Sequence, residues 1–283
     1  MIPAAAHRAA AALHTTPTAH RQVGGGSINR AARVACADGR IVFLKHHPAP
    51  PRGMFAAEAH GLRRLAAANA MRVPAVLAAG DDRLVLEWLA PGPAAPDHDE
   101  RLGRDLAALH RAGAPAFGDD RPGFIATLPL DNRPAPDWAS FYLKRRIAPL
   151  ARAAIDTGAL PARCARQLDG LAAHIGDLIG PPEPPALLHG DLWSGNLISD
   201  RAGAPVVIDP SVHGGHREID LAMMRLFGGF SPRVFAAYAE VFPLAPGAGE
   251  RVSLYQLYPL LVHTVLFGGG YGERAARILA RHA

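Results

Sequence analysis

Cysteine, long apolar runs and aromatic side chains are all scarce in this chain of 283 residues. The two cysteines, Cys36 and Cys164, stand in unrelated contexts, which excludes a disulfide framework and a cysteine-based metal site. We expect both to be reduced thiols in a cytoplasmic protein. No apolar run approaches the ~20 residues that cross a bilayer, so no membrane association is expected.

The charge balance is mildly basic, with 30 Lys and Arg against 25 Asp and Glu. The basic residues are mostly scattered arginines, and the densest cluster is only Lys144-Arg145-Arg146. A nucleic-acid-binding surface needs a longer basic stripe, so we expect no nucleic-acid partner. A basic balance also suits an enzyme that handles anionic phosphates. A basic RNA-associated protein stays a weaker alternative, which salt-sensitive retention on nucleic acid would favour.

The distribution of turn residues divides the chain in two. Gly and Pro are abundant (29 and 26 residues), and Pro91-Gly92-Pro93 separates a strand-rich first part from a mainly helical second part. We therefore predict an α+β protein with two lobes, a small β-rich one over 1–90 and a larger helical one over 91–283.

Periodicity supports this division. In the first lobe it predicts one helix, 54–68, and four strands, 30–35, 40–45, 73–77 and 83–89. Asp38-Gly39 lies between the first two strands as a hairpin signal. In the second lobe it predicts helices over 100–110, 137–154 and 163–179, short strands within 187–208, and further helices from about 220.

The most informative stretch is Leu188-His-Gly-Asp-Leu-Trp-Ser-Gly-Asn196, followed by Val206-Val-Ile-Asp-Pro210. Two short apolar runs with a turn between them join Asn196 to Asp209, thirteen residues later. Such a hairpin returns Asp209 to the neighbourhood of Asn196, with Asp191 on the same loop. Oxygen ligands suit Mg²⁺, so we expect Asn196 and Asp209 to bind the metal and Asp191 to lie at an acceptor hydroxyl.

The first lobe supplies groups that suit phosphates. Gly24, Gly25 and Gly26 precede a strand and can bring backbone N–H groups close to an anion. Lys45 ends a strand, and Glu58 stands thirteen residues later on the predicted helix, where it can pair with Lys45. A lysine held by a glutamate and directed at phosphates is a recurring part of phosphoryl-transfer sites.

The order glycine-rich loop, Lys, Glu, Asp, Asn, Asp resembles the protein-kinase-like superfamily. Here the loop reads His-Gly-Asp and the metal segment Ile-Asp-Pro, which points to small-molecule kinases. The strings His189–Asn196 and Gly215–Met223 resemble the fructosamine kinase (ketosamine 3-kinase) family, and the resemblance runs from about Val23 to the C-terminus. It implies a bilobal kinase-like fold, ATP and Mg²⁺ as cofactors, and a ketosamine substrate, small or protein-bound.

The resemblance also implies roles for particular residues. The loop from Gly24 to Ser27 would cover the phosphates, and Glu87-Trp88-Leu89 would present main-chain groups to adenine. Asp220 would accept hydrogen bonds from the backbone of the 189–196 loop. Many members carry a cysteine where this chain has Ser27, so we expect no redox sensitivity there, and we expect a monomer.

Two further residues are candidates for substrate contacts. Trp193 lies on a polar loop, where an indole either fills the core or forms a platform for a sugar or an amine. His216 stands in the polar run before a helix, where it either contacts substrate or belongs to the scaffold.

We therefore predict that the protein is an ATP-dependent kinase that phosphorylates the 3-hydroxyl of ketosamines. Aminoglycoside, choline and homoserine phosphotransferases share the loop motif and remain alternatives, although the context of Trp193 and Gly215–Glu218 is not expected of them. A catalytically inactive nucleotide-sensing module is a further alternative.

Overall fold

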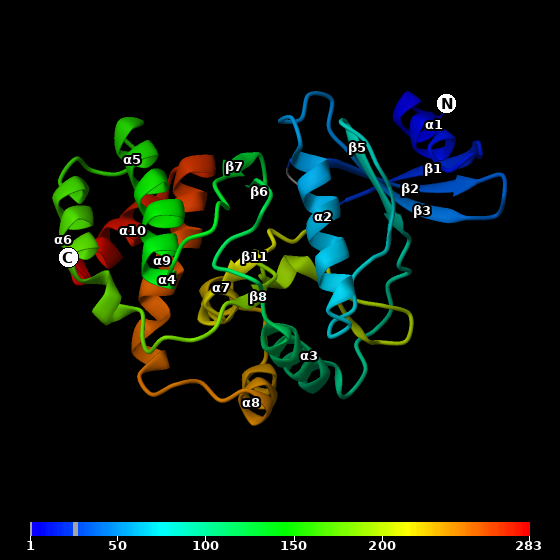
Figure 1. Ribbon diagram of the computed structural model, residues 1–283. Helices are drawn as coiled ribbons and strands as arrows, with labels where there is room; N and C mark the ends of the chain where they lie inside the picture. Colours follow the sequence, from blue (N-terminus) through cyan, green and yellow to red (C-terminus); the bar gives the residue numbers. More distant parts are fainter. Residues whose placement is uncertain (1, 25–27) are drawn as a thin grey trace.

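The structure is a computed structural model that describes residues 2–24 and 28–283. Strands gather in its first 90 residues, and helices predominate after them (Figure 1). The first part consists, in chain order, of α1 (Ala4–Ala11), β1 (Pro17–Val23), β2 (Arg30–Cys36), β3 (Ile41–His46), α2 (Met54–Ala67), β4 (Val76–Ala79) and β5 (Arg83–Glu87).

The strands of this part form one antiparallel sheet in the order β1-β2-β3-β5-β4. The predicted turn between β2 and β3 is confirmed. Gly39 has φ +85°, a conformation that glycine adopts without strain, and the Cys36 N–H donates to the Arg40 carbonyl at 2.8 Å. β4 begins three residues later than expected, at Val76.

A helix covers each face of the sheet (Figure 1). Successive side chains of a strand point to opposite faces, so Val85 packs against α1 while Leu84 and Leu86 pack with α2. The expectation of a single helix in this part was wrong. Six of the eight residues 4–11 are alanine, which has a strong helix propensity but is too small to mark a buried helix face clearly in a sequence.

The second part is mainly helical, with several two-stranded pairings. It consists of α3 (His98–Ala112), β6 (Gly123–Ile125), β7 (Leu128–Leu130), α4 (Trp138–Phe141), the π-helical η1 (Tyr142–Ile147), α5 (Ala148–Asp156), α6 (Cys164–Leu178), β8 (Ala186–Leu188), the 3₁₀ turn η2 (Ser194–Asn196), β9 (Leu197–Ser199), β10 (Pro205–Val207), β11 (His213–Gly215), α7 (Glu218–Phe227), α8 (Pro232–Val241), α9 (Ala248–Phe267) and α10 (Gly270–Arg281). The predicted helices and the short strands of 187–208 are confirmed.

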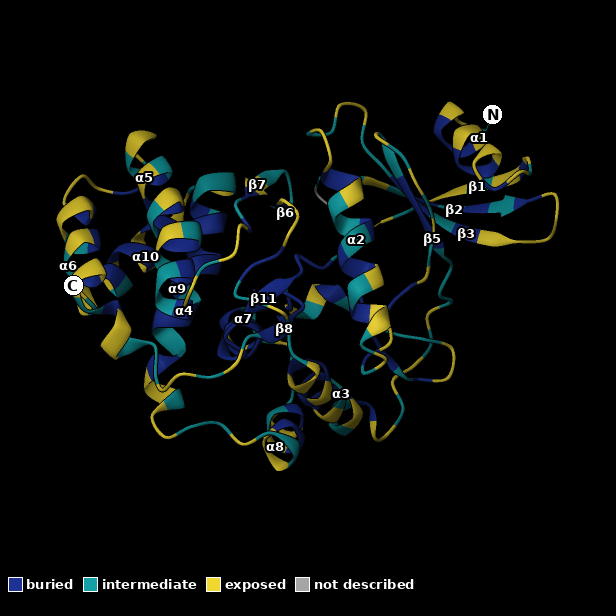
Figure 2. Cartoon of the chain, in the orientation of Figure 1, coloured by how far each residue is buried: buried dark blue, intermediate teal, exposed yellow. Residues whose placement is uncertain are grey.

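The core continues from one part into the other. One buried cluster joins Phe55 and Leu62 of α2 to Leu106 of α3 and Met224 of α7. Figure 2 shows buried residues along the inner sides of these helices. The helix α2 therefore has a fixed position over the second part. No described helix is both long and apolar enough to cross a membrane.

The basic triplet of residues 144–146 lies within η1 and is partly used inside the fold. Arg146 is fully buried, donates to Asn132 Oδ1 at 2.5 Å, and lies over the ring of Phe141 at 4.5 Å. Arg145 pairs with Asp131 at 2.8 Å. These contacts leave little of the triplet as a free basic surface.

Two buried histidines predict that the fold loses stability in acid. Burial lowers the pKa of His213 to about 3 and that of His216 to about 4. Unfolding restores both histidines to an ordinary pKa near 6.5, so below pH ~6.5 the unfolded chain binds more protons than the folded chain does. Each histidine then removes about 1.4 kcal/mol of unfolding free energy per pH unit as pH falls from ~6.5 toward its folded pKa.

Urea unfolding of wild type and His213→Gln between pH 7.5 and 4.5 measures this effect. The variant is expected to have the shallower pH dependence, whereas replacement of the exposed His7 by Gln leaves the slope unchanged. Equal slopes in wild type and His213→Gln would contradict the assignment.

Candidate active site

A cavity of about 490 Å³ brings most of the predicted site residues together. Those that line it are Gly24, Lys45, Glu58, Glu87, Trp88, Leu89, Asp191, Trp193, Asn196 and Asp209. Gly25, Gly26 and Ser27 lie outside the described residues. His216 does not line the cavity.

Lys45 occupies the strand position that faces α2, because its neighbour Leu44 faces α1. Its Nζ donates to both carboxylate oxygens of Glu58 at 2.9 Å and lies 3.1 Å from Asp209 Oδ1. Burial alone lowers the pKa of Lys45, but the two carboxylates outweigh it and raise the pKa above its ordinary value. Lys45 is therefore a fixed cation at this end of the cavity.

The hairpin of β9 and β10 returns Asp209 to Asn196, as predicted. The Ile208 N–H donates to the Asn196 carbonyl at 3.0 Å, and Asn196 Nδ2 donates to the Asp209 carbonyl at 3.4 Å. Asp209 has φ +53°, in the left-handed region that residues other than glycine rarely adopt. The backbone there is held by its surroundings, and the Asp209 side chain keeps 42% of its surface exposed.

The donor set at this point suits a hard cation. Asn196 Nδ2 also donates to the carbonyl (2.8 Å) and to Oδ2 (3.2 Å) of Asp191. Because Nδ2 of Asn196 makes these hydrogen bonds, the amide oxygen Oδ1 is the Asn196 atom that can bind a ligand. Asp209 adds a partly exposed carboxylate. Oxygen donors of this kind fit Mg²⁺.

Asp191 is a carboxyl group with a strongly perturbed acidity. Burial and, after it, the negative charge of Asp209 raise the pKa of Asp191 to about 7. A group with a pKa near neutrality is suited to accept a proton from a hydroxyl.

The buried side chain of Asp220 holds the backbone before Asp191. Its carboxylate accepts from the His189 N–H (2.7 Å), the Gly190 N–H (2.8 Å) and His110 Nε2 (3.2 Å). This is the contact that the resemblance implied. Gly190 has φ +82°, and a Cβ there would collide with the Ser211 carbonyl, so only glycine fits.

The segment 87–89 contributes mainly through its backbone. The Glu87 carboxylate accepts hydrogen bonds from Arg72 at 2.7 Å and from the Ala75 N–H at 3.2 Å. The backbone N–H of Glu87 donates to the Ala75 carbonyl. The side chain is thus structural. In the cavity, the backbone groups of Trp88 and Leu89 are those that could bind an adenine-like ring. Adenine binding at this segment stays a prediction.

Trp193 is exposed rather than part of the core. Its side chain is 41% exposed and covers Gly195, where a Cβ would collide with the indole ring. Its edge meets Phe227 with ring centroids 6.3 Å apart. Of the two positions considered for Trp193, the structure favours the platform at the cavity.

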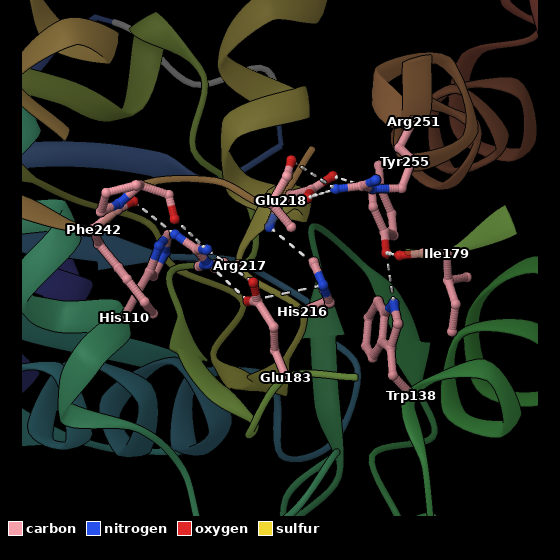
Figure 3. Close-up of polar contacts among 12 residues, drawn as sticks. His110, Trp138, Ile179, Glu183, His216, Arg217, Glu218, Phe242, Arg251 and Tyr255 are labelled. Carbon is pink, nitrogen blue, oxygen red and sulfur yellow. Dashed lines mark hydrogen bonds and ion pairs between the residues drawn. The ribbon is translucent and has the colours of Figure 1, made fainter. Parts of the chain in front are cut away.

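The polar run before α7 belongs to the scaffold, so the expected substrate contact of His216 finds no support. His216 is 3% exposed and stacks on Tyr255 with centroids 5.4 Å apart. Figure 3 shows its neighbours: Arg217 donates to Glu183 and to the Phe242 carbonyl (both 2.7 Å), and Glu218 accepts from Arg251 at 2.6 Å. These contacts attach the start of α7 to the segments around Glu183 and Phe242 and to the helix α9.

Sequence reasoning missed the wall that the end of α9 contributes. Val262, His263, Leu266 and Phe267 line the cavity, more than 50 residues after Asp209. The available signal was a histidine and a phenylalanine on one helix face directly before the run Gly268-Gly269-Gly270.

Comparison with known proteins gives one consistent result. A family model described as fructosamine kinase matches residues 1–283. A probable ketoamine kinase of Thermus thermophilus is 42% identical over 250 residues, which cover 87% of each chain. A chloroplastic protein-ribulosamine 3-kinase of Arabidopsis thaliana is 33% identical, covering 91% of this chain and 80% of that protein.

Solved structures agree. A Thermobifida fusca protein assigned as a fructosamine-3-kinase superposes with a TM-score of 0.92 at 40% identity, covering 100% of this chain and 99% of the other. The aminoglycoside phosphotransferase APH(4)-Ia, at 18% identity, has a TM-score of 0.61 over 95% of both chains. The predicted α+β, protein-kinase-like fold is therefore confirmed.

The geometry predicts a coupled titration of Asp191. Removing the charge of Asp209 by Asp209→Asn takes away a cause that raises the pKa of Asp191, so this pKa is expected to fall below about 7. Carboxyl ¹³C shifts followed by NMR against pH measure it. The exposed control Asp156→Asn is expected to leave it unchanged, and an unchanged midpoint in Asp209→Asn would refute the coupling.

Proposed function

This chain belongs to the fructosamine kinase family, and we propose that it transfers the γ-phosphoryl group of ATP to the 3-hydroxyl of a ketosamine. The observation that carries the proposal is the meeting of Lys45, Asp191, Asn196 and Asp209 on one cavity. Family membership makes the chain an ATP-dependent phosphotransferase. The residue roles below rest on the geometry.

Lys45 binds the phosphates of ATP in this proposal. Glu58 keeps the ammonium in place on the strand, because both of its oxygens accept from Nζ. Phosphoryl transfer is catalysed mostly by positioning and by neutralising charge, which a fixed lysine supplies. The loop from Gly24 to Ser27 would cover the phosphates, and the backbone of residues 87–89 would bind adenine.

Asn196 and Asp209 would hold Mg²⁺ through the amide oxygen and the carboxylate. The bound ion neutralises charge on the transferring phosphoryl group. The hairpin from 196 to 209 keeps these two ligands adjacent, and Asn196 in turn holds Asp191 through Nδ2.

Asp191 would orient the acceptor hydroxyl and take its proton. Asp220 positions the backbone of residues 189–190, which sets where the Asp191 carboxylate enters the cavity. Trp193 beside it offers an indole face to the C–H surface of a sugar.

The reaction implies a repair function. A phosphate on carbon 3 is a good leaving group next to the carbonyl at carbon 2. Enolisation toward the amine-bearing carbon lets the phosphate depart, and hydrolysis then frees the amine. The product therefore decomposes and reverses glycation. We propose that a monomer carries out this activity in the cytoplasm. Cys36 and Cys164 are buried, free thiols, which suits that compartment.

Incubation with Mg-ATP and fructosyl- or ribulosyl-lysine tests the proposal. Mass spectrometry over hours is expected to show a gain of one phosphate, followed by release of free lysine and inorganic phosphate. Kanamycin and choline serve as comparison substrates. Brisk phosphorylation of either one, with no phosphate gained by any ketosamine, would assign the protein to another kinase class.

Replacing the proton acceptor separates chemistry from nucleotide binding. Asp191→Asn is expected to lower kcat about 10²–10⁴-fold, the usual contribution of a general base, with little change in the Kd of ATP. Asp209→Asn is the contrasting variant, because it should raise the Mg²⁺ concentration required for activity. Near-normal kcat in Asp191→Asn would exclude this role.

A further inference from the structure

A partly buried ion pair joins the two parts of the chain outside the cavity. Arg64 of α2 pairs with Asp119, which lies on the loop between α3 and β6. The Asp119 side chain is 2% exposed and that of Arg64 is 21% exposed. Neither residue lines the cavity. The pair nevertheless connects the part of the chain that holds Lys45 with the part that holds Asp191.

The Asp119 carboxylate has several hydrogen-bond donors around it. It accepts from Arg64 and from the Arg121 N–H at 3.2 Å, and its Oδ1 lies 3.3 Å from His60 Nε2. Burial alone raises the pKa of Asp119, but hydrogen bonds and the charge of Arg64 outweigh it and hold this pKa below its ordinary value. A buried carboxylate is costly without such partners, so Asp119 favours the position of α2 that supplies them.

The backbone beside Asp119 is anchored to the strands that lead into the 189–196 loop. The Asp119 N–H donates to the Asn132 carbonyl at 2.7 Å, and Gly118 and Gly214 exchange two backbone hydrogen bonds, both of 2.8 Å. Gly214 belongs to β11, which pairs with β8, and β8 ends directly before the 189–196 loop. Asp119 therefore has a fixed position relative to that loop.

The helix α2 presents different sides to Asp119 and to the sheet, and it also contacts β6 (Figure 1). His60 and Arg64 are about one turn apart and both face Asp119, whereas Glu58 precedes His60 by two residues and lies roughly on the opposite side. There its carboxylate accepts from Lys45. Apolar packing of α2 in the core is not directional, so the polar contacts on its two sides define its rotation.

Lys45 is sensitive to the position of Glu58 because a second carboxylate competes for it. The Lys45 Nζ lies 2.9 Å from both oxygens of Glu58 and 3.1 Å from Asp209 Oδ1. If Glu58 moved away, Lys45 would pair with Asp209 alone, and this pair would occupy the carboxylate that is expected to bind Mg²⁺. The position of α2 therefore affects how well the cavity can bind Mg-ATP.

We propose that Asp119 is a positioning residue for the nucleotide: through Arg64 it sets α2 so that Glu58 keeps Lys45 available to the phosphates of ATP. The proposal rests on the proposed function, because that function assigns Lys45 to the phosphates. Asp119 itself makes no contact with ATP, the metal or the sugar in this proposal. Its whole effect on nucleotide binding therefore passes through Glu58.

Calorimetric titration with Mg-ATP, without a ketosamine, tests the first consequence. Asp119→Asn and, separately, Arg64→Gln are expected to raise the Kd of Mg-ATP about 2- to 30-fold, the range for residues that act through a coupled network. Arg64→Lys keeps the charge and should bind Mg-ATP more tightly than Arg64→Gln. Asp120→Asn is the matched control and should bind as wild type, because Asp120 is the next residue of the same loop with a side chain 83% exposed.

Combination with Glu58→Gln tests the path of the effect. Glu58→Gln alone is expected to weaken Mg-ATP binding. Adding Asp119→Asn to it should then change the Kd by less than about twofold, because two substitutions that remove the same coupled contact are not additive. Melting temperatures accompany each titration. Should Asp119→Asn fail to fold, Arg64→Gln, at the partly exposed partner, replaces it in the same comparison.

The outcomes separate the role of Asp119 from the proposed function. An unchanged Kd in Arg64→Gln, while Glu58→Gln weakens binding, would overturn the role of Asp119 alone. Effects of Asp119→Asn and Glu58→Gln that multiply in the double variant would overturn it as well, since Asp119 would then support the fold without acting through Glu58. An unchanged Kd in Glu58→Gln would instead refute the binding of phosphates by Lys45 and Glu58, and the role of Asp119 with it.

Discussion

The hydrogen-bonding requirement of one buried carboxylate, Asp220, governs the geometry of the active site. A carboxylate removed from water is costly unless its oxygens accept hydrogen bonds, and the N–H groups of His189 and Gly190 supply two of them. The backbone can offer both only because Gly190 adopts a left-handed conformation against Ser211. The next residue is Asp191, so the same constraint sets where the Asp191 carboxylate enters the cavity.

The helix that carries Asp220 is itself attached at its start by two ion pairs, one buried and one partly buried. Arg217 is held by Glu183 and by main-chain carbonyls of the loop before α9, and Glu218 pairs with Arg251 of α9 (Figure 3). The ion pair to Arg251 connects α7 with α9, whose last residues line the cavity. The start of α7 therefore connects the 189–196 loop with the part of α9 that lines the cavity.

Electrostatics in the cavity follow from three groups in close contact. Lys45 is balanced by Glu58 and Asp209, and this pairing keeps a cation and a partly exposed carboxylate side by side. Asp191 is half-buried beside the same negative charge of Asp209, and partial removal from water together with that charge raises its pKa to about 7. A polar motif in a sequence does not reveal such couplings, because they depend on distances between side chains that only folding brings together.

The sequence by itself determined the features that local patterns control. Asp38-Gly39 predicted the β2–β3 hairpin, and the two apolar runs after Asn196 predicted the return of Asp209, because short turns leave the chain few alternatives. The order of Lys45, Glu58, Asp191, Asn196 and Asp209 indicated the protein-kinase-like fold, and the strings 189–196 and 215–223 indicated the family. Only the tertiary structure decided that His216 is buried in the scaffold, that Trp193 lines the cavity, and that the end of α9 lines it as well. These outcomes depend on packing between segments far apart in the chain, and a local pattern does not specify which distant segment a residue will contact.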